Sequence, residues 1–121
     1  MTDRENRLFA HNFVNRIWKH YFGIGIVEPV DDLSDANPPT HPHLLDSLAR
    51  DFIASNFDIR HIERRILRSR VYQFSSLPNR TNSEDRKNFA RSYPRNLMAE
   101  VAVDVINSAV GVQETCLLYH I

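Results

Sequence analysis

Residues 41–72 read HPHLLDSLARDFIASNFDIRHIERRILRSRVY, and this stretch decides the fold. Its first half repeats apolar residues at helical spacing, which predicts a helix with one continuous apolar face. The residues of that face are Leu44, Leu45, Leu48, Ala49, Phe52 and Ile53. Asn56-Phe57-Asp58 ends this helix, and Asp58 can cap a second helix from Ile59 to about Tyr72. Because the connection is so short, the two helices should pack as a hairpin.

A longer amphipathic helix is predicted before the hairpin, over about Thr2 to Phe22. Its apolar positions are Leu8, Phe9, Phe13, Val14, Ile17, Trp18 and Tyr21. Thr2-x-x-Glu5 fits a capping box at its start, and Gly23 is well placed for a left-handed cap at its end. A proline-rich loop over about residues 23–41 then leads to the hairpin, whose first helix Thr40 can cap.

Two more helices are predicted after the hairpin. Residues 75–83 are polar and are typical of a surface loop, whereas Ser83 to Ala90 favours a short helix. From Asn96 onward apolar residues again recur at the helical period, and Gly111 ends the run. The sequence therefore predicts an all-α fold of four to five helices, in a single domain over residues 1–121.

Composition excludes several classes of protein. Cys116 is the only cysteine, so the chain has neither an internal disulfide framework nor a Cys-x-x-Cys motif for metal or haem. No stretch approaches the roughly 18 apolar residues of a membrane span, and we expect no membrane partner. Residues 1–7 lack the basic-then-apolar pattern of a signal peptide.

The charges sum to zero but are sorted along the chain. Residues 28–58 hold seven acids and one base, whereas residues 59–95 hold ten bases and three acids. We expect the acidic loop and the arginine-rich helix after it to neutralise each other. Nucleic acid is not an expected partner, because general affinity for it requires a net positive footprint.

The proline-rich loop carries the candidate catalytic residues Asp31, Asp32 and His41. Neighbouring carboxylates can work as an acid/base pair or assist a metal ion. The structural alternative is that one aspartate shapes the loop while another pairs with Arg16 or an arginine of the third helix. His41-Pro42-His43 has metal-like spacing but no third ligand, so no metal site is assigned.

The third predicted helix carries candidate anion-binding residues. Arg60, Arg64 and Arg68 recur one turn apart and could hold phosphates or carboxylates. The aromatic residues Trp18, Tyr72 and Phe74 have the pattern of core or core-edge residues. We therefore expect no aromatic stacking platform beside the arginines.

Several strings of the sequence match a known family. They are Asn15-Arg16-Ile17-Trp18, Phe22-Gly23-x-Gly25-Ile26-Val27, Pro29-Val30-Asp31-Asp32-Leu33, Asn37-Pro38-Pro39-Thr40-His41-Pro42-x-Leu44-Leu45-Asp46 and Ser69-x-x-Tyr72-Gln73-x-Ser75-Ser76. The chain resembles, over about Leu8 to Glu114, the planctomycete-type domain of unknown function 1553. That domain occurs in large exported bacterial proteins, often beside a cytochrome-c-like module. The tail at 112–121 does not resemble the family, and the family domain is longer, so we expect a truncated part of it.

The resemblance implies context and no catalytic assignment. It implies a helical module of a larger exported bacterial protein, with neighbouring domains as partners and haem only in one of those domains. We expect no cofactor in this chain itself. Asn15, Arg16 and Asn37 lie in the matched strings and are candidate structural or binding residues of the loop.

Three functions are thus open. The leading hypothesis is a non-catalytic interaction or scaffold part of a redox-associated protein, because no complete catalytic constellation is present. The first alternative is part of an enzyme site, built on the loop residues Asp31, Asp32 and His41. The second alternative is binding of anionic polymers through the arginine-rich third helix.

Overall fold

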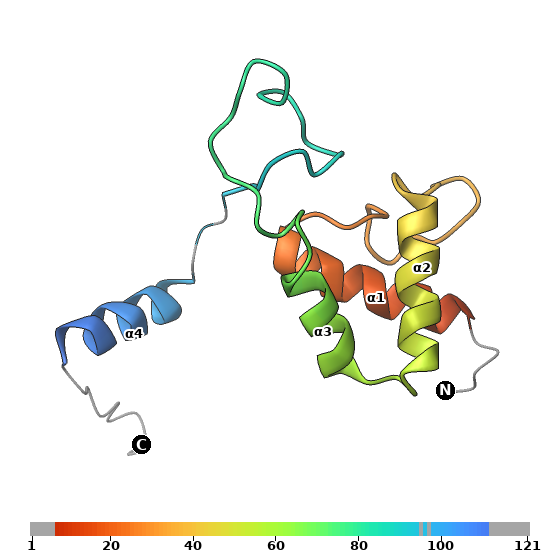
Figure 1. Cartoon of the computed structure of the whole chain (residues 1–121), viewed down its shortest axis with the longest axis horizontal. Helices are drawn as coiled ribbons and strands as arrows, with labels where there is room; N and C mark the ends of the chain where they lie inside the picture. The colour runs from red at the N-terminus through yellow and green to blue at the C-terminus, as the bar shows by residue number, and fades with distance from the viewer. Residues whose placement is uncertain (1–6, 95, 97, 112–121) are drawn as a thin grey trace, which may run out of the picture.

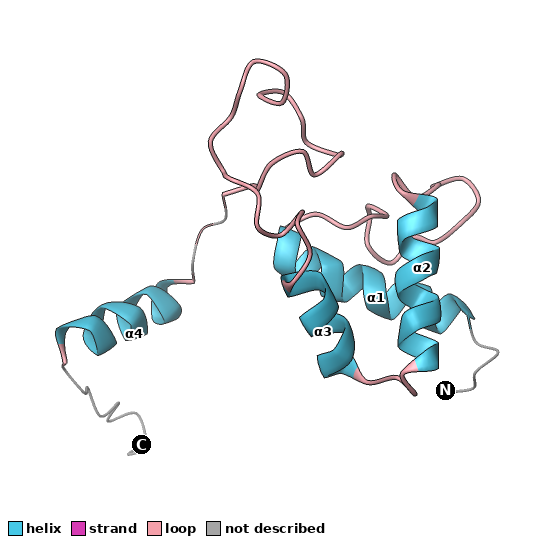
Figure 2. Cartoon of the chain, viewed as in Figure 1, coloured by secondary structure: helices cyan, strands magenta, loops and turns pink. Residues whose placement is uncertain are grey.

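The computed structural model describes residues 7–94, 96 and 98–111, and it is all-α over these residues (Figures 1 and 2). The described helices are α1 (Arg7–Phe22), α2 (Pro42–Ala54), α3 (Ile59–Leu67) and α4 (Ala99–Val110). No strand occurs in the described part of the chain. The predicted fold class is confirmed.

The first three helices form the body of the protein. Each of α1, α2 and α3 contacts the other two, and α2 and α3 cross α1 side by side (Figure 1). Their apolar faces enclose the core. The buried apolar residues are Ala10, Val14, Trp18, Phe22, Ile26, Val27, Leu45, Leu48, Ala49, Phe52, Ile62, Ile66 and Phe89. The faces predicted from helical periodicity on residues 8–22 and 44–53 supply six of these 13 residues, whereas Leu8, predicted on the first face, is 71% exposed.

The predicted hairpin of α2 and α3 is confirmed, including its cap. The Asp58 side chain accepts a hydrogen bond from the backbone N–H of His61 at 3.2 Å. Asn56 and Phe57 turn the chain with φ of 57° and 61°, which is an unusual conformation for residues other than glycine. The third helix is shorter than predicted. It ends at Leu67, and the Ser69 hydroxyl accepts from the N–H of Tyr72, so local side-chain bonding replaces the helix there.

Two helix caps were predicted beside the proline-rich loop, and only one of them forms. Gly23 ends α1 with φ of 81°, and its N–H donates to the Lys19 carbonyl, which confirms the predicted left-handed cap. Thr40 was predicted to cap α2, and this is wrong. Its hydroxyl and its N–H both donate to the Ile26 carbonyl, and His41 takes the N-cap position, where its side chain makes no capping hydrogen bond to the helix. The capping box predicted at residues 2–5 lies outside the described residues.

The short helix predicted over Ser83 to Ala90 does not form, and Figure 2 shows loop there. The Asp85 carboxylate accepts hydrogen bonds from the backbone N–H groups of Lys87, Asn88 and Ala90. Such local bonds compete with the backbone bonds of a helix. Phe89 adopts φ of 55° and inserts its buried ring into the core, where it lies edge-on to Trp18.

The Asp85 turn makes the stability of this loop dependent on pH. Partial burial raises the pKa of Asp85, but the N–H donors of Ala90, Asn88 and Lys87 outweigh it and lower the pKa to about 2. A carboxyl with a lowered pKa stabilises the fold above its ordinary pKa, and the contribution is lost as pH falls through the folded value.

We therefore expect Asp85→Asn to lower the free energy of unfolding by about 1–2 kcal/mol at neutral pH. The difference from the parent chain should shrink between pH 4 and pH 2, because the parent carboxyl then becomes protonated. Urea unfolding, followed by the fluorescence of Trp18 against which Phe89 packs, measures both. A difference that stays constant down to pH 2 would contradict the assignment. Asp35→Asn serves as the control, because Asp35 is an exposed loop aspartate.

The last helix lies apart from the body (Figure 1). Its predicted end is confirmed, since α4 runs to Val110 and Gly111 caps it with a left-handed φ of 74°, whereas it begins at Ala99 and not at Asn96. None of its residues is buried, and it has no contact with another described helix. Its large apolar side chains are exposed, together with that of the preceding Met98; they are Val101, Val103, Val105, Ile106 and Val110.

Candidate functional site

The proline-rich loop is bound to α1 through the buried amide of Asn15. Its Oδ1 accepts from the backbone N–H of Ile26 at 2.7 Å and of Val27 at 3.0 Å. Its Nδ2 donates to the carbonyls of Val27 at 2.9 Å and Val30 at 3.1 Å. One side chain therefore satisfies four backbone groups of the loop.

Gly25 allows this close approach of loop and helix. A Cβ at position 25 would overlap the Val27 carbonyl oxygen and lie 3.0 Å from Oδ1 of Asn15. The N–H of Gly25 donates to the Glu28 carboxylate at 3.0 Å, and the Lys19 ammonium donates to the same carboxylate at 2.6 Å. These bonds, that of Lys19 first, lower the pKa of Glu28.

Asp31 forms an ion pair with Arg16, which confirms the predicted contact. The two side chains are 58% and 59% exposed, so the pair lies at the surface. Exposed pairs gain little, because water screens the attraction and two long side chains must be held in place. The pair therefore orients the loop more than it stabilises the fold.

We expect Asp31→Ala to lower the free energy of unfolding by less than about 1 kcal/mol, with most of that difference lost in 1 M salt. Urea unfolding at low and high salt measures it. Asp32→Ala is the matched control, since Asp32 has no ion pair in the described part of the chain and its difference should not depend on salt. A loss of several kcal/mol for Asp31→Ala would contradict a surface pair.

The structure does not bring the three candidate catalytic residues together. The Asp32 carboxylate accepts from the N–H of Ser34 at 3.2 Å, and Asn37 donates to the Asp32 carbonyl at 2.8 Å. His41 Nδ1 lies 3.1 Å from the Thr40 hydroxyl, and its ring lies against Phe89. Within residues 7–94, no hydrogen bond or ion pair joins Asp31, Asp32 and His41. Each of them has a local contact of its own.

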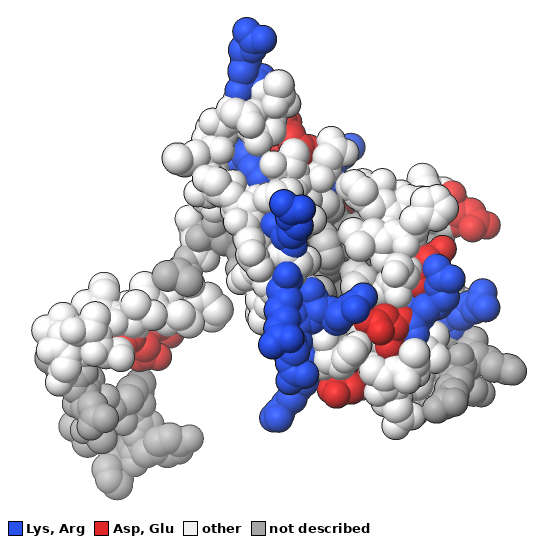
Figure 3. All heavy atoms as spheres, viewed as in Figure 1, with Lys and Arg blue, Asp and Glu red and all other residues white. Residues whose placement is uncertain are grey.

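The expected neutralisation of the acidic region by the arginine-rich helix is largely wrong. The loop acids Asp31 and Glu28 pair with Arg16 and Lys19, both of which belong to α1. Among the described residues, ion pairs join the two regions only at Asp51 of α2, whose carboxylate pairs with Arg65 and lies beside the ring of His61. The arginines of α3 are therefore mostly available at the surface, and Figure 3 shows Lys and Arg side chains gathered in a column over this helix.

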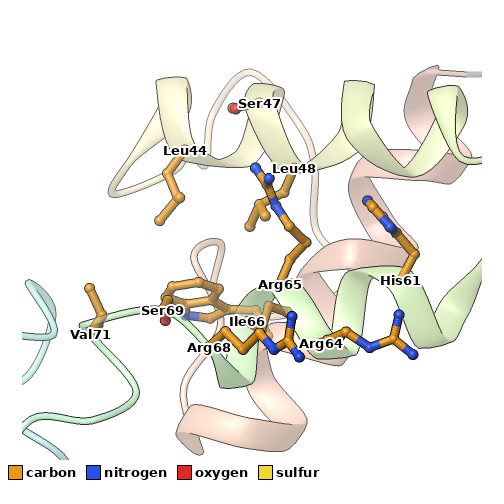
Figure 4. Close-up of a pocket in the computed structure, with 11 residues that line it drawn as sticks. Leu44, Ser47, Leu48, His61, Arg64, Arg65, Ile66, Arg68, Ser69 and Val71 are labelled. Atoms are coloured by element: carbon orange, nitrogen blue, oxygen red, sulfur yellow. The ribbon is translucent and has the colours of Figure 1, made fainter.

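A pocket of about 620 Å³ opens between α2 and α3. Leu44 and Leu48 extend into it from α2, and Arg65 extends from α3 toward α2 (Figure 4). We call it the α2/α3 pocket. Its lining residues are Trp18, Leu44, Ser47, Leu48, His61, Arg64, Arg65, Ile66, Arg68, Ser69 and Val71. The pocket thus combines apolar side chains with three arginines.

The hydrogen bonding of the pocket is incomplete. Nε of Arg65 and Nε2 of His61 each lie 3.2 Å from the same carboxylate oxygen of Asp51. Arg64 and Arg68 have no ion pair among the described residues. Trp18 is 2% exposed, and its indole Nε1 is buried with no hydrogen-bond partner in the described part of the chain.

Sequence reasoning found the arginines of this pocket but not the pocket itself. Trp18 was assigned to the core, which is correct, but it also lines the pocket beside the arginines. Tyr72 and Phe74, expected at the core or its edge, are 36% and 44% exposed. The available signal was the one-turn spacing of Leu44 with Leu48 and of Arg64 with Arg68. Each pair lies on one side of its helix, and in a hairpin these two sides can face each other across a pocket.

The described residues contain neither a metal-ligating cluster nor a membrane-spanning helix. No three His, Cys, Asp or Glu side chains of these residues lie close enough together to hold a metal ion. None of the described helices is long and apolar enough to cross a membrane.

These features define an all-α domain. Its proline-rich loop is fixed to α1, and a pocket lined by arginines opens between α2 and α3. The chain belongs to the PSD1 family, described as a protein of unknown function (DUF1553), which matches residues 1–117. The resemblance found in the sequence is thus confirmed. The match also includes residues 112–117, although the tail at 112–121 was not expected to resemble the family. No curated protein and no solved structure matches the chain.

Proposed function

We propose that this chain is a non-catalytic helical interaction module of a larger exported bacterial protein. Its partners are neighbouring domains of the same polypeptide, one of them a haem-carrying redox module, while the chain itself holds no cofactor. The observation that carries the proposal is the exposed apolar surface of α4.

The surface of α4 supports an interaction role. Ile106 is 60% exposed and Val110 is 70% exposed, and no residue of the helix is buried. A helix whose five large apolar side chains are all exposed is typical of an interaction site, because contact of apolar surface with water is unfavourable. A neighbouring domain of the same polypeptide is held at high effective concentration and can cover this surface at little entropic cost.

The loop residues support a role without catalysis. Asp31 pairs with Arg16, and Asp32 with Asn37 closes a turn of the loop. A general acid or base must lie within hydrogen-bond reach of its partner group. The separate local contacts of Asp31, Asp32 and His41 instead fit a loop that is held in one shape.

Hydrogen exchange of α4 tests this function. The amides of residues 101–110 are expected to exchange rapidly in the 121-residue chain and slowly in a longer polypeptide that includes the neighbouring haem module. A longer polypeptide from which only the haem module has been deleted identifies the domain that covers α4. Equal exchange of α4 in all three proteins would contradict the proposal, with the buried amides of α2 as the internal standard.

A pair of variants of equal charge sharpens the test. Ile106→Asp places a charge on the apolar surface, whereas Ser108→Asp places the same charge at a polar position of the same helix. We expect Ile106→Asp to abolish the protection of α4 in the longer polypeptide and Ser108→Asp to retain it. Equal loss in both variants would indicate an effect of charge on the helix and not of a covered apolar face.

Binding of anionic polymers through α3 is the second candidate function. It is favoured by the exposed side chains of Arg60, Arg64 and Arg68, which recur one turn apart and have no ion pair among the described residues. Retention on heparin that falls steeply with salt, and falls equally for Arg60→Gln and Arg64→Gln, would support it. Retention that ignores ionic strength would count against it.

A further inference from the structure

We infer that the α2/α3 pocket binds a small amphipathic carboxylate, that is, one carboxylate on an apolar body. This ligand site is independent of the proposed interaction role of α4, because it uses residues of α1, α2, α3 and the segment 68–71 that follows α3. Its apolar lining, its free arginines and its buried indole each constrain the ligand in a different way.

The apolar lining selects the body of the ligand. Leu44, Leu48 and Ile66 line the pocket together with Val71 and the indole of Trp18. The volume of about 620 Å³ falls in the range of roughly 300–1,000 Å³ that is usual for small-molecule sites. A purely polar anion would leave this surface in contact with water, so an apolar chain or ring is the better occupant.

The arginines select the charge of the ligand. Arg64 and Arg68 have no ion pair within the described residues, whereas Arg65 is engaged with Asp51. A guanidinium fork matches a carboxylate and can hold it with two parallel hydrogen bonds. Two free guanidinium groups beside an apolar surface therefore suit an acid whose head stays at the pocket mouth.

The indole of Trp18 distinguishes a small ligand from a polymer. Its Nε1 is a hydrogen-bond donor, and it is buried without a partner. Because the indole is 2% exposed, only a ligand small enough to enter the pocket can contact it. A polymer lying along α3 would contact the exposed arginines but would not enter the pocket that Trp18 lines.

Trp18 is the only tryptophan of the chain, so its fluorescence reports directly on the pocket. The probes are octanoate, 1-octanol and acetate, which carry both parts of the proposed ligand, the apolar body alone and the carboxylate alone. We expect octanoate to change the fluorescence saturably, with a dissociation constant at least about tenfold below those of 1-octanol and acetate. Equal affinity for octanoate and 1-octanol, or no response to octanoate, would overturn the inference.

The role of the arginines in binding is tested with glutamine variants, which leave the other charged side chains of α3 in place. The double variant Arg64→Gln/Arg68→Gln is expected to weaken octanoate binding at least about tenfold, since a hydrogen bond between charged groups is lost. Arg60→Gln is the matched control, because Arg60 lies on α3 but does not line the pocket. If Arg60→Gln weakens octanoate as much as the double variant, the binding is to the general charge of α3 and the inference is wrong. All three side chains are exposed, so circular dichroism should show folded variants.

Discussion

Replacing Asn15 with leucine is expected to lower the free energy of unfolding by about 3–5 kcal/mol. The side chain is fully buried in α1 and makes four hydrogen bonds to the loop. Leucine has a similar size but offers no polar atom. Two N–H groups and two carbonyls of the loop would then lose their partners, and each buried unpaired group is unfavourable by about 1–3 kcal/mol before the loop relaxes.

Two further variants separate the contributions of this amide. Asn15→Asp keeps the acceptor for the N–H groups of Ile26 and Val27 but removes both donors, so an intermediate loss is expected. Asn12→Leu is the matched control. Asn12 lies on the same helix, and within the described residues its side chain accepts a hydrogen bond only from the exposed Arg16. Its replacement should therefore change the stability by less than about 1 kcal/mol.

Urea unfolding followed by Trp18 fluorescence and by circular dichroism measures this series. Because Ile26 and Val27 are themselves part of the core, loss of the loop should unfold the whole body in one transition. An Asn15→Leu variant within 1 kcal/mol of the parent chain would contradict the role assigned to the amide.

The sequence predicted those features that local interactions determine. The spacing of apolar residues placed α1, α2 and α4, and the caps at Gly23, Asp58 and Gly111 follow from the backbone conformation or side-chain acceptor that each residue favours. The pairing of α2 and α3 followed from their short connection. These signals are contained within a few residues of chain.

The features that the sequence did not predict depend on contacts between distant segments. Asn15 lay in a string shared with the family, but its burial requires the loop to fold back over α1. The helix expected at 83–90 was lost because Asp85 binds the backbone and Phe89 enters the core. The α2/α3 pocket exists only once Trp18 of α1 lies beneath two other helices.

The second large loss of stability is expected in a cluster of four phenylalanine rings, those of Phe9, Phe13, Phe52 and Phe57. Phe52 of α2 is 1% exposed and stacks on Phe13 of α1, with ring centroids 5.1 Å apart and nearly parallel planes. It also meets Phe57 edge-on at 5.3 Å, and Phe9 completes the cluster by contacting Phe13 and Phe57. The ring of Phe52 therefore joins α1, α2 and the turn before α3.

We expect Phe52→Ala to lower the free energy of unfolding by about 3–5 kcal/mol, the usual range for removing a buried aromatic ring and leaving a cavity. Phe52→Leu fills most of the cavity and should lose clearly less. Phe74→Ala is the matched control, because Phe74 is 44% exposed and lies outside the cluster. Its loss should remain below about 1 kcal/mol.

The loss at Phe52 should also reach the turn between α2 and α3. Phe57 holds a left-handed backbone that is unfavourable for a bulky residue, and its packing against Phe52 and Phe9 offsets that strain. In Phe52→Ala we therefore expect the amides of residues 55–58 to exchange faster than those at the start of α2, under conditions where the body remains folded. Uniform acceleration along α2 would show that the aromatic ring supports the helix as a whole and not the turn. Because this turn sets the separation of α2 and α3, a loosened turn should also weaken octanoate binding in the α2/α3 pocket.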